Sequence, residues 1–140
     1  MSQFPVVTHV FLLRQGSVLL LRRAGTGFAN GQYGPAGGHL EPGESIRQAA
    51  VRECREEVGV ELDPAHLRMI GVSHYRTAHS EGIDFFLTAT SWDGEPYARA
   101  ECDEVRWCPL DAFPENTLPF VRRALAHHLQ AGQWFDETEM

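Results

Sequence analysis

The sequence lacks a long apolar run, a secretion signal and an ordered set of cysteines, and each absence excludes a class of protein. No apolar run approaches the roughly 20 residues needed to span a bilayer. Residues 1–10 contain neither the basic region nor the apolar core of a secretion signal. The three cysteines, Cys54, Cys102 and Cys108, are odd in number and irregularly spaced, so they predict neither a disulfide framework nor a zinc site. We therefore expect reduced thiols, a cytoplasmic location and no membrane partner.

The charge balance limits the partners that the chain is expected to have. It carries 12 basic and 19 acidic residues, a net charge of −7, within 140 residues. Because no basic stripe is present, we expect no nucleic acid polymer as a partner. A ligand that bears phosphate would be repelled unless bound cations reversed the local charge. The length is typical of one domain, so we expect a single domain over residues 1–140.

Short apolar stretches predict five strands, and turn residues separate them. The strands are expected at Val6–Leu13, Val18–Leu21, Leu67–His74, Ile83–Thr90 and Val105–Cys108. Gln15–Ser17 predicts a hairpin turn between the first two strands. Residues 25–34 are rich in Gly, Asn and Thr, so they predict a loop.

Two helices are expected, and the first has clear boundary signals. Ser45 followed by Gln48 matches a capping box and Gly59 is a C-terminal stop, so the helix should span residues 46–58. A second helix is expected over residues 118–130, followed by a short acidic tail. Strands divided by one central and one terminal helix predict an α/β fold with a mixed sheet between the helices.

Three glutamates on the first predicted helix form the most informative cluster. Glu53, Glu56 and Glu57 stand at i, i+3 and i+4, a spacing that places their side chains on one helix face. Adjacent like charges repel, and a divalent cation removes that repulsion. Mg²⁺ takes carboxylate oxygens while it keeps sites for water and for substrate phosphates. A solvated charged face is the alternative interpretation of such a cluster.

The glutamates belong to a longer pattern that disfavours this alternative. Residues 38–60 read GHLEPGESIRQAAVRECREEVGV and place Gly, Glu, Arg-Glu, Glu-Glu and Gly at fixed intervals. This stretch resembles the Nudix box, with Cys54, a small hydrophobe, in a position that is usually aliphatic. The preceding residues 33–39 resemble the family's aromatic-x-Pro-Gly-Gly segment, with Ala36 where glycine is more usual. Residues 107–110 resemble its closing strand.

The resemblance implies a Nudix-type α/β/α sandwich with a mixed central sheet and a metal-dependent active site. The implied metal ligands are Glu53, Glu56, Glu57, the Gly38 carbonyl and, from a later loop, Glu101. For the general base we favour Glu56, with Glu53 and Glu44 as alternatives. Arg52 borders the glutamate face, where its guanidinium is expected to hold carboxylates in place through paired hydrogen bonds.

Five residues outside the glutamate cluster are candidates for substrate contact. They are Arg23, Phe28, Tyr33, His39 and Phe85. An aromatic ring can stack on a base, an arginine can meet phosphate or ribose, and His39 follows two glycines that permit close backbone approach. For each of them a structural or surface role is the alternative, and aromatic residues in strands most often belong to the core.

The function implied by the resemblance is that of a small MutT-like Nudix hydrolase. We expect hydrolysis of a phosphoanhydride bond in a nucleoside triphosphate, including a modified or oxidised one, to monophosphate and pyrophosphate, with Mg²⁺ or alternatively Mn²⁺. Hydrolysis of ADP-ribose or another nucleoside diphosphate derivative is the second expectation. A non-catalytic nucleotide sensor is the third, disfavoured because all the box glutamates are present. Monomer and homodimer both remain open.

Overall fold

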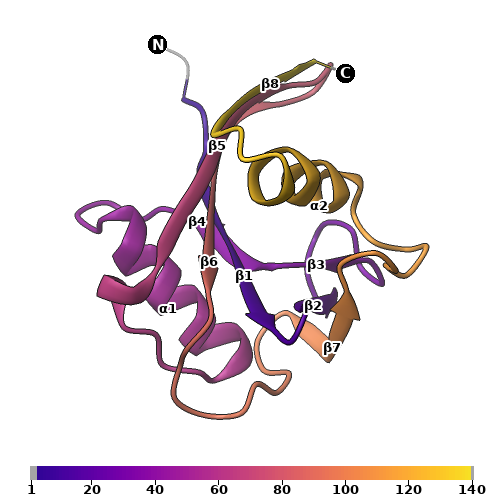
Figure 1. Cartoon of the computed structure of the whole chain (residues 1–140). Coiled ribbons are helices and arrows are strands. Elements are labelled where there is room, and N and C mark those ends of the chain that lie inside the picture. The colour runs from indigo at the N-terminus through magenta and orange to yellow at the C-terminus, as the bar shows by residue number, and fades with distance from the viewer. Residues whose placement is uncertain (1–2, 140) are drawn as a thin grey trace.

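The computed structural model describes residues 3–139, in which an eight-stranded sheet lies between two helices (Figure 1). The strands are β1 (Val6–Arg14), β2 (Ser17–Arg23), β3 (Tyr33–Gly34), β4 (Ala36–His39), β5 (Arg68–Arg76), β6 (Glu81–Ala89), β7 (Cys102–Pro109) and β8 (Phe135–Glu139). The helices are α1 (Ile46–Val58) and α2 (Pro119–Ala124), with a 3₁₀ turn η1 (Pro64–His66) and a π-helical continuation of α2 called η2 (Leu125–Gln130).

The sheet is mixed, as the sequence predicts. The strand order is β3-β2-β1-β6-β5-β8, with β4 paired to β1 and β7 paired to β2. β1 runs parallel to β6 and antiparallel to β2 and β4. At the predicted hairpin turn, Gln15 and Gly16 have φ values of 52° and 76°. Two successive positive φ values are typical of the tight turns that match the twist of a hairpin.

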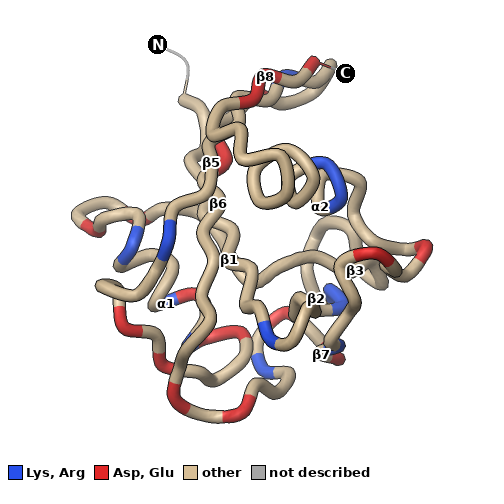
Figure 2. The backbone as a smooth tube through the Cα atoms, viewed as in Figure 1, with Lys and Arg blue, Asp and Glu red and all other residues tan. Residues whose placement is uncertain are grey.

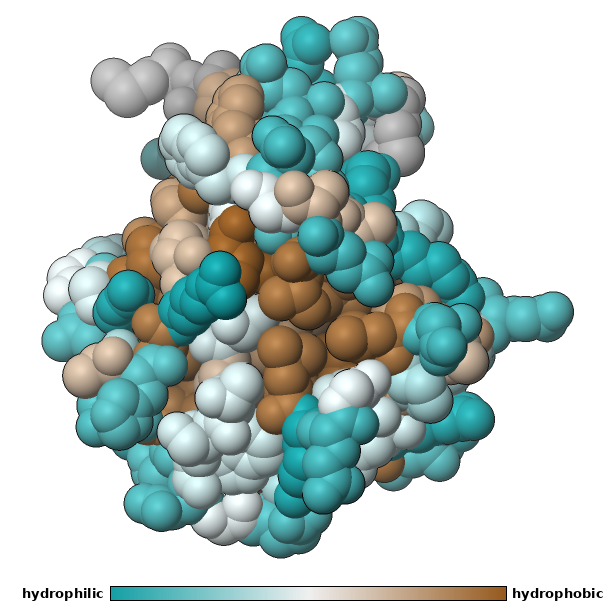
Figure 3. Space-filling view, viewed as in Figure 1, coloured by the Kyte–Doolittle hydropathy of each residue, from teal (hydrophilic) through white to brown (hydrophobic). Residues whose placement is uncertain are grey.

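Two apolar layers hold α1 and α2 on opposite faces of the sheet (Figure 1). Cys54 and Val58 of α1 are fully buried in one layer. Val121 and Leu125, from α2 and η2, are buried in the other. This arrangement is the expected α/β/α sandwich. In the view of Figure 3 apolar residues also reach the surface near the centre of the molecule, among hydrophilic side chains.

The boundaries of α1 agree with the prediction because they depend on local signals. The Ser45 hydroxyl accepts a hydrogen bond from the Gln48 amide at 3.0 Å, and the Gln48 side chain accepts one from the Ser45 amide at 2.8 Å. Gly59 closes the helix with φ 71°, and its amide donates to the Arg55 carbonyl at 3.2 Å. Glycine occupies this left-handed conformation without the steric cost of a side chain.

Three expectations about the strands were wrong, each because pairing is decided by distant residues. Tyr33–Gly34 lies within the predicted loop but pairs with β2 as β3. The predicted acidic tail forms β8, which runs parallel to β5. β7 begins at Cys102 rather than Val105, because its pairing with β2 continues past a register shift at Arg22 and Arg23.

The cysteines agree with the expectation of reduced thiols. Cys54, Cys102 and Cys108 are all free and buried. Within residues 3–139, no helix is long and apolar enough to cross a membrane. Figure 2 shows the arginine positions distributed along the chain among acidic ones.

A glycine in β5 makes room for a buried histidine of η2. His128 is 3% exposed, and its Nδ1 lies 2.6 Å from the Gln133 carbonyl oxygen. Burial is the main cause that lowers the pKa of His128. A Cβ atom placed on Gly71 would lie 2.0 Å from His128 Nδ1, well inside van der Waals contact.

We expect Gly71→Ala to destabilise the fold by roughly 1–3 kcal/mol, because the added methyl group forces the His128 ring out of its packed position. Urea unfolding followed by circular dichroism measures this change. Gly27→Ala is the matched control, since nothing lies within 4 Å of a Cβ atom there. Equal unfolding midpoints for the two variants would contradict the packing described for Gly71.

Candidate active site

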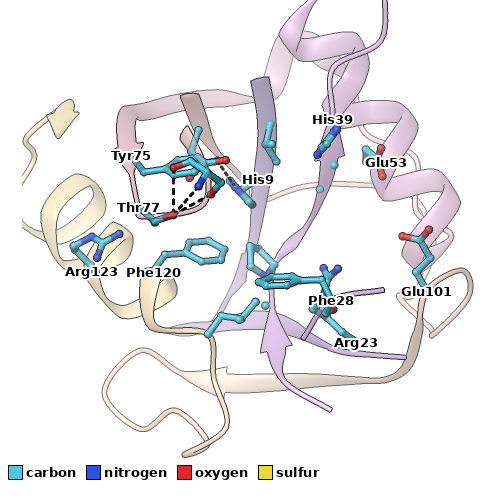
Figure 4. A pocket seen from close by; sticks show the side chains of 18 residues that line it. His9, Arg23, Phe28, His39, Glu53, Tyr75, Thr77, Glu101, Phe120 and Arg123 are labelled. Atoms are coloured by element: carbon cyan, nitrogen blue, oxygen red, sulfur yellow. Dashed lines mark hydrogen bonds and ion pairs between the residues drawn. The ribbon is translucent and has the colours of Figure 1, made fainter. Parts of the chain in front are cut away.

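A cavity of about 620 Å³ opens between the β4–α1 side of the sheet and the α2 side (Figure 4). Its lining includes candidate catalytic residues, aromatic rings, and both acidic and basic side chains. The lining residues are Val7, His9, Arg23, Phe28, Gly34, Pro35, Gly37, Gly38, His39, Glu53, Tyr75, Thr77, Ser80, Asp84, Glu101, Leu118, Phe120 and Arg123. Its size is within the range of sites for small molecules such as nucleotides.

The Glu53 carboxylate faces the cavity across a glycine. A Cβ atom on Gly38 would lie 2.4 Å from Glu53 Oε1, so only glycine leaves this approach open. The side chain of Glu53 is 13% exposed. Burial raises the pKa of Glu53, and Arg52 opposes that shift. The result is a largely buried carboxylate with the backbone of β4 directly in front of it.

Glu57 lies deeper, one turn further along α1. Its Oε2 accepts a hydrogen bond from the Gly37 amide at 2.7 Å. The residue is only 8% exposed. Burial raises the pKa of Glu57 to about 8 against the opposing effect of the Gly37 hydrogen bond, and the nearby Glu53 and Glu101 carboxylates add to the rise. The ionised form of Glu57 is therefore disfavoured at this position, and a bound cation would stabilise it.

Arg52 ties the glutamates to the chain before the helix. Its Nε and one terminal nitrogen donate to the two carboxylate oxygens of Glu44 at 3.0 and 2.7 Å. The other terminal nitrogen donates to Glu53 at 2.9 Å and to Glu56 at 3.4 Å. The His39 carbonyl accepts a further hydrogen bond at 3.1 Å. Arg52 is placed to orient Glu53, and the Glu44 carboxylate keeps a lowered pKa through its hydrogen bonds to Arg52.

The structure brings six of the sequence candidates to the cavity and leaves the others outside its lining. Those at the cavity are Arg23, Phe28, Gly38, His39, Glu53 and Glu101. Glu57 lies behind Gly37, while Glu44 contacts Arg52. Glu56, favoured from the sequence as general base, is 52% exposed and does not line the cavity. Of the three candidates for the base, Glu53 alone does.

Tyr33 and Phe85 do not lie where a base could stack on them. Tyr33 is 4% exposed, and its hydroxyl donates to Glu104. Phe85 packs against the apolar layer on the α1 side of the sheet. Neither lines the cavity. Successive side chains of a strand point to opposite faces of the sheet, and both rings point away from the cavity. The composition of these segments does not reveal which face each side chain takes.

The donor set fits a hard divalent cation. Burial is the main cause of the raised pKa of Glu57, and repulsion by the Glu53 and Glu101 carboxylates adds to it. The space in front of Glu53 exists only because residue 38 is glycine. Carboxylate and carbonyl oxygens are the ligands that Mg²⁺ prefers. Among residues 3–139 no three His, Cys, Asp or Glu side chains are arranged as they stand to hold a metal ion.

The buried Glu57 carboxylate predicts a pH effect in metal-free protein. Its folded pKa of about 8 lies above the ordinary 4.5, so the folded state holds its proton more tightly than the unfolded chain. Folding stability should therefore fall as pH rises from 4.5 towards 8, by a few kcal/mol at most. Urea unfolding in EDTA at pH 5 and pH 8 measures it. Glu57→Gln should reduce the difference in unfolding free energy between pH 5 and pH 8. An equal difference in the wild type and the variant would contradict the raised pKa of Glu57 as its cause.

The far side of the cavity is formed by residues that sequence reasoning missed. His9 of β1, Asp84 of β6 and Phe120 of α2 all line it. Thr77 and Ser80, from the loop between β5 and β6, complete its rim. The available signal was a histidine and an aspartate, each in a strand that is mostly apolar. Only the parallel pairing of β1 with β6 shows that these residues are neighbours.

Comparison with known proteins identifies the family. The NUDIX domain family model matches residues 3–129. A crystal structure of a MutT NUDIX hydrolase from Burkholderia pseudomallei superposes with a TM-score of 0.81 at 25% identity, covering 89% of this chain and 98% of that one. The chain therefore belongs to the Nudix family, as the box predicts.

Two curated relatives extend the similarity. The NAD-capped RNA hydrolase NudC of Pseudomonas aeruginosa is 38% identical over 131 residues, which are 92% of this chain and 45% of that protein. The oxidized purine nucleoside triphosphate hydrolase of Danio rerio is 34% identical over 112 residues, 78% of this chain and 69% of that protein. The chain thus spans less than half the length of NudC. Both names agree with the hydrolase class expected from the sequence.

Proposed function

We propose that the chain hydrolyses a phosphoanhydride bond of a nucleoside triphosphate, including an oxidised one, to monophosphate and pyrophosphate. The observation that carries the proposal is the Glu53 carboxylate facing the cavity, with buried Glu57 behind it and Glu101 beside it. The Danio rerio relative, whose name specifies an oxidized purine nucleoside triphosphate, supports this substrate class.

Glu53, Glu57, Glu101 and the Gly38 carbonyl would hold Mg²⁺, or alternatively Mn²⁺, and Glu56 stays a predicted ligand at their exposed edge. The ion, when bound, neutralises phosphate charge and lowers the pKa of a coordinated water. Glu53 is the carboxylate placed to take a proton from water at the cavity, which is why we favour it over Glu56. Arg52 holds Glu53 in position, and Glu44 holds Arg52.

Arg23, Phe28 and His39, which the sequence also predicts, line the cavity and would contact the substrate. Arg23 lies over the ring of Phe28, with its guanidinium carbon 5.8 Å from the ring centre. This pair brings a cation and an exposed aromatic face to the same side of the cavity, suited to phosphate or ribose and to a base. His39 follows Gly37 and Gly38, where it can meet phosphate oxygens.

A second candidate is hydrolysis of a dinucleotide diphosphate, such as a NAD-like group at the end of an RNA. The 38% identical NudC of Pseudomonas aeruginosa favours it. Because the name of that relative specifies a capped RNA, the expectation that no nucleic acid polymer is a partner stays a prediction. Cytoplasmic location and the choice between monomer and homodimer stay predictions as well.

The test is product analysis after incubation with Mg²⁺ and a panel of substrates. The panel contains normal and oxidised nucleoside triphosphates, ADP-ribose, NAD and a NAD-capped oligonucleotide. We expect monophosphate and pyrophosphate from a triphosphate as the fastest reaction. Faster cleavage of NAD or of the capped oligonucleotide would replace this proposal by the second. No cleavage by folded protein that binds nucleotide would instead indicate a sensor.

A further inference from the structure

The cavity carries a further carboxylate on the side away from Glu53 and Glu101. Asp84 of β6 is 15% exposed, and its Oδ1 lies 3.1 Å from Nε2 of His9, which is 14% exposed. β1 and β6 pair in parallel with Val7 opposite Asp84. Among residues 3–139, His9 is the only hydrogen-bond partner of this carboxylate. Three of its roughly four acceptor sites therefore remain for a ligand.

Aromatic rings border this carboxylate. The His9 ring packs against both Phe86 and Phe120, with ring centres 5.1 and 4.8 Å away, and these two rings also contact each other at 6.2 Å. Phe120 lines the cavity, and Phe28, which is 69% exposed, lines it from the loop before β3. Figure 4 shows Phe120 and Phe28 between the side with Glu53 and Glu101 and the side with Tyr75 and Thr77. A planar base bound between these two sides would stack on Phe120 or Phe28.

Charge decides which end of a nucleotide lies at Asp84. A carboxylate repels phosphate, and no arginine or lysine pairs with Asp84 in the described part of the chain. Phosphates are therefore expected beside Arg23 and the cation-binding glutamates, and the base beside Asp84. The carboxylate then requires N–H donors from the base.

A carboxylate is best satisfied by two neighbouring donors, because its two oxygens accept in parallel. Guanine presents such a pair, N1–H and the 2-amino group, on one edge. Adenine and cytosine present an amino group beside an acceptor nitrogen, and uracil and thymine present one N–H between two carbonyl groups. Oxidation of the imidazole ring of guanine leaves the donor edge intact.

We propose that Asp84, held in place by His9, accepts hydrogen bonds from the N1–H and 2-amino groups of a guanine-type base stacked on Phe120, and so sets the base preference of the enzyme. This inference rests on the proposed function, since it concerns the same cavity. His9 acts as a positioning residue through Asp84. The base preference thereby depends on β1 and β6, outside the family box.

The test compares binding of GMP and of inosine monophosphate, which lacks only the 2-amino group, by calorimetry in the presence of Mg²⁺. The wild type should bind GMP at least roughly 10-fold more tightly than inosine monophosphate, because one hydrogen bond to a charged group contributes about that much affinity. Asp84→Asn should lose this preference because its amide presents only one acceptor oxygen. Asp63→Asn is the control: Asp63 caps η1 through its side chain, a contact that asparagine also makes, and it should keep the preference.

Equal affinity of the wild type for both nucleotides, or an unchanged preference in folded Asp84→Asn, would overturn the inference. The wild-type comparison needs no variant, so a variant that fails to fold leaves the test intact. Turnover of GTP and of inosine triphosphate separates the two proposals. Preferential GMP binding without turnover of any substrate would overturn the proposed function alone. Turnover of both triphosphates with equal kcat/KM would overturn the role of Asp84 alone.

Discussion

Glu57→Gln is expected to lower kcat by roughly 10³-fold while the fold is retained. Glutamine keeps the shape of the side chain and an oxygen that can accept the Gly37 amide, but it removes the negative charge. Loss of one cation ligand forfeits several kcal/mol of transition-state stabilisation, and each 1.36 kcal/mol corresponds to about a factor of ten. Steady-state hydrolysis of the best substrate at saturating Mg²⁺ measures the effect.

The matched control for this variant is Glu115→Gln, which changes an exposed glutamate outside the cavity lining. It should retain full activity. Because burial raises the pKa of Glu57, the neutral amide should also keep or increase the stability of the metal-free protein at pH 8. Wild-type activity in Glu57→Gln would show that this glutamate does not hold the ion.

Arg52→Lys is expected to lower kcat by roughly 10- to 100-fold, although the positive charge is kept. Arginine meets Glu44 with two nitrogens and Glu53 with a third, a fork that a single ammonium group cannot reproduce. Substitution of a residue that orients metal ligands typically lowers metal affinity or activity by about 10- to 100-fold. Mn²⁺ affinity, followed by paramagnetic resonance, should weaken together with kcat.

Arg47→Lys on the same helix is the control, because Arg47 is exposed and does not line the cavity. It should leave both kcat and Mn²⁺ affinity unchanged. If Arg52→Lys had the same kinetics as Arg47→Lys, the guanidinium would be structural and the orientation of Glu53 would depend on other contacts.

The half of the site that the sequence predicts is the half built from local signals. The capping box at Ser45 and the stop at Gly59 determine α1, and the helical spacing then places Glu53 and Glu57. Gly38 is part of the same sequence pattern, although its position depends on the pairing of β4 with β1. The fold class was predictable because apolar stretches and helices alternate along the chain.

The other half depends on contacts between residues far apart in the chain. His9 and Asp84 are 75 positions apart, and only the register of β1 against β6 brings them together. Phe120 reaches the cavity because α2 packs on the opposite face from α1. β8 shows the same limit, because an acidic segment without alternation gives no sign of the parallel pairing with β5.

The measurement that tests the central claim most directly is hydrolysis of the best panel substrate in EDTA, followed by addition of excess Mg²⁺ to the same sample. A carboxylate site that works through a divalent cation predicts no detectable turnover in EDTA and full recovery after the addition. Turnover that continues unchanged in EDTA would contradict the role assigned to Glu53, Glu57 and Glu101.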